Sequence, residues 1–229
     1  MANSLLFKSL AGIGGVSAVT GAAIGIPKLL EDKGELISEL IKTKNPNKRL
    51  ITSQSLEDAD WKKSWEDYRK ANKNAKKGED SFQLSDWSGS ITTDITDSTA
   101  SQSLLNACSS NSKKRVVESS QLYKDVLNYC TRDTLISDLL KESGKTPLLK
   151  SEAANSAGWK AAWERYRIAN KDKDSDDWKL QDFNGQKNQA SQQAWETFRT
   201  QCETNLNSKD ISKSVFLEQV KDWCTVEGI

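Results

Sequence analysis

The sequence of 229 residues contains no histidine, only three prolines and only twelve glycines. The absence of histidine removes the commonest general base of enzymes and the commonest side-chain ligand of metal ions. So few prolines and glycines argue against a β-sandwich, a collagen-like chain and a linker-rich chain. Because 33 Lys and Arg residues face 32 Asp and Glu residues, the charge balance gives no reason to expect nucleic acid as a partner.

Catalytic and cofactor-binding motifs are also missing. The chain has no glycine-rich phosphate loop, no nucleophile elbow and no Cys-His pairing. The acidic stretch 172–176 lacks the glycine and the twelfth-position glutamate of a calcium loop. The carboxylate pairs Glu57/Asp58 and Asp176/Asp177 lie in polar stretches that we expect to be exposed. We therefore predict no catalytic residue, no metal and no cofactor, with an enzyme that uses an unrecognised carboxylate site as the alternative.

The N-terminal segment carries the longest uncharged run, from Ser9 to Pro27. Its apolar or small residues from Leu10 to Ile26 come close to the minimum for a membrane-spanning helix, which needs about 17–25 residues. We interpret residues 1–33 as a signal-anchor helix and a juxtamembrane linker, with the lipid bilayer as partner. A cleaved signal peptide and a Gly/Ala-rich soluble segment are the alternatives. No basic residue precedes Lys8 and no clean Ala-x-Ala site follows, which disfavours cleavage.

The remainder of the chain is one pattern written twice, because blocks of the first copy recur 94 to 99 residues later. The most specific block reads W-x3-W-x2-Y-R-x-A-N-K. Its aromatic residues are Trp61, Trp65 and Tyr68 in the first copy and Trp159, Trp163 and Tyr166 in the second. We therefore predict two tandem modules, residues 34–132 and residues 133–229.

Hydrophobic periodicity predicts four short helices in each module. In the first module they cover 36–42, 60–74, 99–108 and 120–130; in the second, 135–141, the matching aromatic block, 191–202 and 212–224. Ser55 or Asp58 can cap the second helix. We expect turns or short extended pieces around Leu84 and Leu180, and a nearly straight helical passage between the modules through 131–133. The predicted fold is mostly α: an N-terminal hydrophobic helix followed by two small helical bundles.

The aromatic block has two interpretations. A row of Trp and Tyr side chains could form a face on which a carbohydrate stacks. Its helical spacing favours a buried core face instead, since residues three and four apart lie on one side of a helix.

The cysteines form two matched pairs with 21 residues between the members of each: Cys108 with Cys130, and Cys202 with Cys224. We favour one disulfide within each module, because the number is even and an N-terminal membrane signal suits an oxidising compartment. Such a loop would contribute about 3 kcal/mol on the chain-entropy model. Buried reduced thiols that pack as small apolar groups are the alternative. A zinc site is disfavoured because there is no C-x-x-C spacing and no histidine.

The order of these motifs resembles the large paralogous families of uncharacterised membrane-associated proteins in haemotropic mycoplasmas. The resemblance covers nearly the whole chain and is most specific in Trp61–Lys73 and Tyr129–Asp133. It implies a cell-surface protein of a wall-less bacterium that takes part in immune evasion or host-cell contact, and it brings no catalytic residues with it.

These observations together predict a non-catalytic, single-pass surface protein of the cell membrane with its C-terminal modules outside the cell. We expect a role in host interaction or antigenic variation. An adhesin for one host protein or glycan is the alternative.

Overall fold

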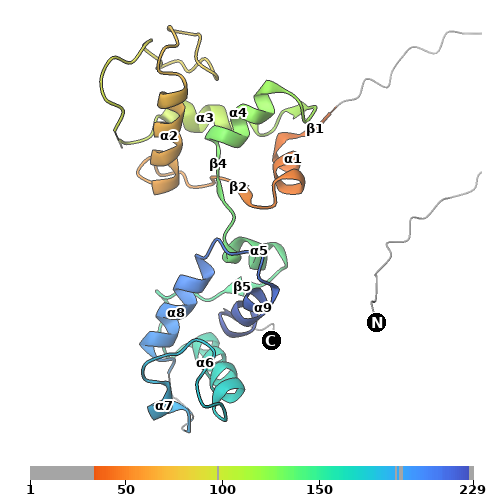
Figure 1. Cartoon of the computed structure of the whole chain (residues 1–229), viewed down its shortest axis with the longest axis vertical. Coiled ribbons are helices and arrows are strands. Elements are labelled where there is room, and N and C mark those ends of the chain that lie inside the picture. Colours follow the sequence, from red (N-terminus) through yellow and green to blue (C-terminus); the bar gives the residue numbers. More distant parts are fainter. Residues whose placement is uncertain (1–33, 97, 189, 191–192, 227–229) are drawn as a thin grey trace, which may run out of the picture. The chain divides into compact units, whose positions relative to one another are not determined.

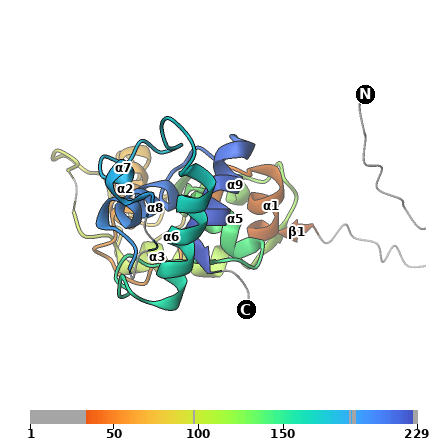
Figure 2. The same ribbon diagram turned by 90° about the horizontal axis from the view of Figure 1, so that it is seen from below.

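The computed structural model describes residues 34–96, 98–188, 190 and 193–226, and the chain is mostly α-helical over these ranges (Figure 1; Figure 2). The predicted signal anchor, residues 1–33, lies outside the described residues. Among the helices that are described, none combines the length and the apolar character needed to cross a membrane. Residues from Gly34 onward form one compact unit.

Each half of this unit contains short helices and very short strands. The first half, Gly34–Asp133, contains β1 (Glu35–Leu36), α1 (Ile37–Lys44), β2 (Lys48–Leu50), α2 (Ala59–Ala71), α3 (Gln102–Asn111), β3 (Arg115–Val116), α4 (Gln121–Tyr129) and β4 (Thr131–Asp133). The second half, Thr134–Val226, contains α5 (Ile136–Glu142), β5 (Thr146–Pro147), α6 (Ala157–Asn170), α7 (Phe183–Gln186), α8 (Glu196–Leu206), α9 (Ser214–Trp223) and β6 (Thr225–Val226).

The strands form antiparallel pairs that the hydrophobic pattern did not predict. Strand β1 pairs with β3, β2 with β4, and β5 with β6. Each strand has only two or three residues, which is too short for an alternating pattern to emerge from the sequence. Each pair ties together backbone segments that lie far apart along the chain.

Side-chain caps decide where several helices begin. The Asp58 carboxylate accepts hydrogen bonds from the Asp60 and Trp61 amides at the start of α2. Ser156 caps α6 in the same way through the Trp159 amide. Such caps satisfy amides that have no partner within the helix. Ser101 caps α3, which therefore begins at Gln102 rather than at Thr99 as predicted.

Two separate clusters of buried apolar residues form the interior. The first contains residues from Ile37 to Cys130, and the second contains residues from Ile136 to Cys224. The two clusters have no residue in common. In each cluster an aromatic helix, α2 or α6, packs on the last helix of its half, α4 or α9.

The passage between the halves corrects a prediction. We expected the last helix of the first module to run nearly straight into the next helix, but Thr131–Asp133 is strand β4. Thr131 lies opposite Leu50, and the Ile51 amide donates to the Cys130 carbonyl at 3.0 Å. Helix α4 ends at Tyr129 because the following backbone finds its hydrogen-bond partners in β2 instead. The predicted boundary between residues 132 and 133 therefore falls inside a strand.

Candidate functional site

Both predicted disulfides are present. Cys108 on α3 is bonded to Cys130 at the end of α4, and Cys202 on α8 is bonded to Cys224 at the end of α9. The Cα atoms lie 5.4 Å apart in the first pair and 5.5 Å apart in the second. All four residues are buried. The bonds therefore hold together the last two long helices of each half.

The aromatic stripe lies mainly in the interior. The second half buries its three rings completely, with Trp159 and Tyr166 at 0% exposure and Trp163 at 1%. In the first half Trp61 and Tyr68 are buried, whereas Trp65 is half-buried and lies beneath the Arg69 guanidinium at 5.4 Å from the ring centre. Rings in these positions contribute to packing and offer little surface on which a sugar could stack.

A buried polar bracket surrounds each of the two tyrosines. The Tyr68 hydroxyl donates to the Asp80 carboxylate and accepts from the Phe82 amide at 2.9 Å. The same carboxylate oxygen accepts from the Leu84 amide at 2.8 Å. Asn72 completes the bracket by accepting from the Ser81 amide at 2.8 Å. Tyrosine, aspartate and asparagine thus fold the loop after α2 back onto that helix.

The second half repeats this bracket residue for residue. The Tyr166 hydroxyl donates to Asp176 and accepts from the Trp178 amide at 3.3 Å, and the Leu180 amide donates to Asp176 at 3.0 Å. Asn170 accepts from the Asp177 amide at 3.0 Å. Burial raises the pKa of the Tyr166 hydroxyl, as does its hydrogen bond to Asp176, so the hydroxyl stays a donor at neutral pH.

The aspartates of the bracket were missed in the sequence, and one expectation about them was wrong. We expected Asp176 to be exposed, but its exposure is 6%, and that of Asp80 is 2%. Hydrophobicity cannot reveal such residues, because they are buried only by virtue of the tyrosine hydroxyl and backbone amides that solvate them. The signal that could have found them is the repeat, since Asp80 and Asp176 stand two residues before the matched aromatic positions Phe82 and Trp178.

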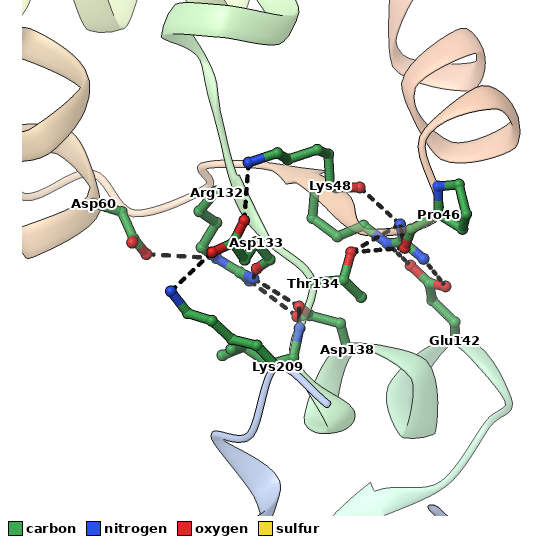
Figure 3. Close-up of polar contacts among 11 residues, drawn as sticks. Pro46, Lys48, Asp60, Arg132, Asp133, Thr134, Asp138, Glu142 and Lys209 are labelled. Atoms are coloured by element: carbon green, nitrogen blue, oxygen red, sulfur yellow. Dashed lines mark hydrogen bonds and ion pairs between the residues drawn. The ribbon is translucent and has the colours of Figure 1, made fainter. Parts of the chain in front are cut away.

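A second polar cluster lies where the two halves meet (Figure 3). Arg132 on β4 makes a two-point contact with Asp138 on α5, at 2.6 and 2.9 Å. The Asp133 carboxylate accepts from Lys48 and from Lys209, both at 2.8 Å. Arg132 of the first half therefore faces a carboxylate of the second half, and Lys209 of the second half faces a carboxylate of the first.

The other side of the β2–β4 ladder continues this cluster. Arg49 on β2 contacts the Glu142 carboxylate on α5 at 2.7 and 3.0 Å. The buried Thr134 donates its hydroxyl to the Pro46 carbonyl and its amide to the Asn47 carbonyl, both at 2.9 Å. The chain is thus held against the first half immediately before α5 begins.

A cavity of about 300 Å³ opens onto this cluster. It is lined by Asn45, Asn47, Lys48, Asp60, Lys63, Ser64, Asp67, Leu127, Asn128, Thr131, Arg132, Asp133 and Lys209. Hydrogen bonds from Lys209 and Lys48 lower the pKa of Asp133 to about 2. Burial raises the pKa of Asp60, and the neighbouring Asp58 adds to the effect. The charged side chains here neutralise one another, and the arrangement contains no nucleophile paired with a base.

The chemistry available elsewhere is limited as well. In the part of the chain that the structure describes, no three His, Cys, Asp or Glu side chains gather in a way that could hold a metal ion. Each bracket tyrosine donates its hydroxyl to an aspartate, and that carboxylate also accepts from a backbone amide. No protein family, no curated protein and no solved structure matches the chain.

Proposed function

We propose that the chain is a non-catalytic, membrane-anchored surface protein that displays two copies of one disulfide-linked helical module. Its role on this proposal is contact with a host or variation of the surface that a host recognises. Residues 1–33 supply the anchor, and the two halves supply the displayed part.

The observation that carries the proposal is that the two copies share structural features in their interiors but differ in a surface loop. Three features that the copies share lie largely in the interior: the disulfide, the aromatic stripe and the Tyr–Asp–Asn bracket. An active site shared by both copies would place common polar side chains in an accessible pocket. The shared polar groups instead hold the fold together, which favours a scaffold whose exposed residues are free to vary.

The loop after the aromatic helix shows how far the surfaces differ. In the first half residues 73–79 carry the exposed Lys73, Lys76 and Lys77. The matching loop of the second half, residues 171–175, carries the exposed Lys171, Asp172, Lys173 and Asp174. The bracket beneath is the same in both, so the loop has lost its net positive charge without a change in its support. Such variation is typical of a displayed surface that differs from copy to copy, and not of a binding site that both copies share.

Protease treatment of intact cells tests the display. We expect trypsin to remove the C-terminal half from intact cells, as followed with an antibody against residues 134–226. A cytoplasmic protein in the same cells should resist digestion until the membrane is permeabilised. Complete protection of the C-terminal half in intact cells would overturn the surface assignment.

A binding assay then separates a displayed antigen from an adhesin. Purified full-length protein is added to host cells, with and without exchange of residues 73–79 for residues 171–175. Saturable binding that is lost on exchange would indicate an adhesin, whereas no binding would favour an antigenic role.

A further inference from the structure

The two halves have separate interiors, so something other than a shared core must fix their arrangement. The apolar clusters have no residue in common. The extensive packing between elements lies within one half or the other. The contacts described above between the halves are hydrogen bonds and ion pairs. A junction of this kind depends on charge rather than on burial of apolar surface.

Four charged residues that the first half places at the junction are not kept in the second copy of the pattern. In the aligned copies, the positions of Lys48, Arg49, Asp60 and Arg132 correspond to uncharged residues in the second half: Thr146, Pro147, Gly158 and Val226. Strands β5 and β6 still pair there as β2 and β4 do. The first half therefore carries these four charges where it meets the second half, and strand pairing alone does not require them.

Solvent reaches the ion pairs unevenly. The Lys209 side chain is 67% exposed and that of Asp133 is 39% exposed, whereas Arg132 and Asp138 are 19% and 15% exposed. Arg132, Asp133 and Lys209 also line the cavity at the junction. Exposed pairs are screened strongly, since the Debye length falls from about 10 Å at 0.1 M salt to about 3 Å at 1 M.

We propose that the junction is an electrostatic latch: at low ionic strength it holds the two halves in one arrangement, and at high ionic strength it releases them while each half stays folded. The two-point ion pairs of Arg49 with Glu142 and of Arg132 with Asp138 contribute most to holding it closed. Lys209 with Asp133 is its outer, most salt-sensitive pair. Each half keeps its own core and its own disulfide, which is why release does not require unfolding.

Hydrogen exchange on the intact, non-reduced chain tests the latch. The Thr134 amide donates to the Asn47 carbonyl of the first half and therefore reports on the junction. We expect this amide to exchange roughly tenfold faster in about 1 M NaCl than in about 50 mM NaCl. Amides in the middle of α2 and α6 should keep their protection in both solutions.

Variants test which ion pairs hold the halves together. The pair Asp138→Asn and Glu142→Gln should raise exchange at Thr134 in low salt to the level that the parent chain shows in high salt. Glu218→Gln is the matched control, because Glu218 forms an exposed pair with Lys221 that is not part of the junction. If the double variant also loses protection in α2 and α6, the substitutions have unfolded the halves themselves. The comparison of low and high salt on the parent chain then tests the proposal. The proposal is overturned if Thr134 stays as protected as α2 and α6 at both salt concentrations, or if all of them lose protection together.

Discussion

The Tyr166 hydroxyl gives the sharpest prediction. Tyr166→Phe keeps the buried ring and removes one oxygen atom, so the packing around Trp178 and Phe198 is unchanged. The variant removes the hydroxyl donor of Asp176 and the acceptor of the Trp178 amide. Asp176, at 6% exposure, then keeps its contact with the Leu180 amide at 3.0 Å. The loss is therefore one hydrogen bond to a buried carboxylate and one backbone partner.

The magnitude follows from these two losses. A hydrogen bond to a charged group contributes about 1.5–3 kcal/mol, and a neutral one contributes about 1 kcal/mol. Tyr166→Phe should therefore lower the free energy of unfolding by about 3 kcal/mol. Tyr123→Phe is the matched control, because this tyrosine is also buried but its hydroxyl accepts from the neutral Asn45 side chain. The control should lose about 1 kcal/mol.

Urea denaturation of the non-reduced protein, followed by circular dichroism at neutral pH, measures both values. The variant Asp176→Asn completes a double-mutant cycle with Tyr166→Phe, and we expect a coupling of about 1–2 kcal/mol between the two positions. A loss in Tyr166→Phe no larger than that in Tyr123→Phe would refute the view that the bracket stabilises the fold.

Three further predictions concern stability. Replacing both cysteines of the second disulfide, as in Cys202→Ser with its partner, should cost about 3 kcal/mol in urea denaturation, because a loop with a sequence separation of 22 is no longer closed in the unfolded chain; an unchanged midpoint would contradict this. Asp133 has a pKa of about 2 when folded, against 3.8 in its ordinary state, because Lys209 and Lys48 donate to it. Its contribution is therefore complete above about pH 4 and is lost as the pH falls through about 2. Because its side chain is 39% exposed, solvent screening reduces that contribution to about 1 kcal/mol. When the pH falls from about 4 to about 2, the free energy of unfolding of Asp133→Asn should therefore drop by about 1 kcal/mol less than that of the parent chain. Lys179 and Gln83 occupy left-handed backbone at φ 53°, so Lys179→Gly should raise the thermal midpoint by an amount equivalent to about 1 kcal/mol, and a lowered midpoint would contradict the assigned strain.

Much of the helical framework could be predicted from the sequence. The helices, the Asp58 cap and the cysteine pairs follow from local patterns that a repeat makes visible twice. The short strands could not be predicted, since two or three residues carry no period. The bracket aspartates were also missed, because a buried carboxylate and an exposed one look the same in a polar stretch.

The sequence by itself determined that the chain is mostly helical from Gly34 onward and that the second half repeats the first. These properties depend on neighbours along the chain, which a linear pattern records. Only the tertiary structure decided that Thr131–Asp133 is a strand and that Arg132 meets Asp138. It also decided that Asp80 and Asp176 lie in the interior. The physical reason is that the partner of each of these groups comes from another element, and its position depends on how the helices pack rather than on their order.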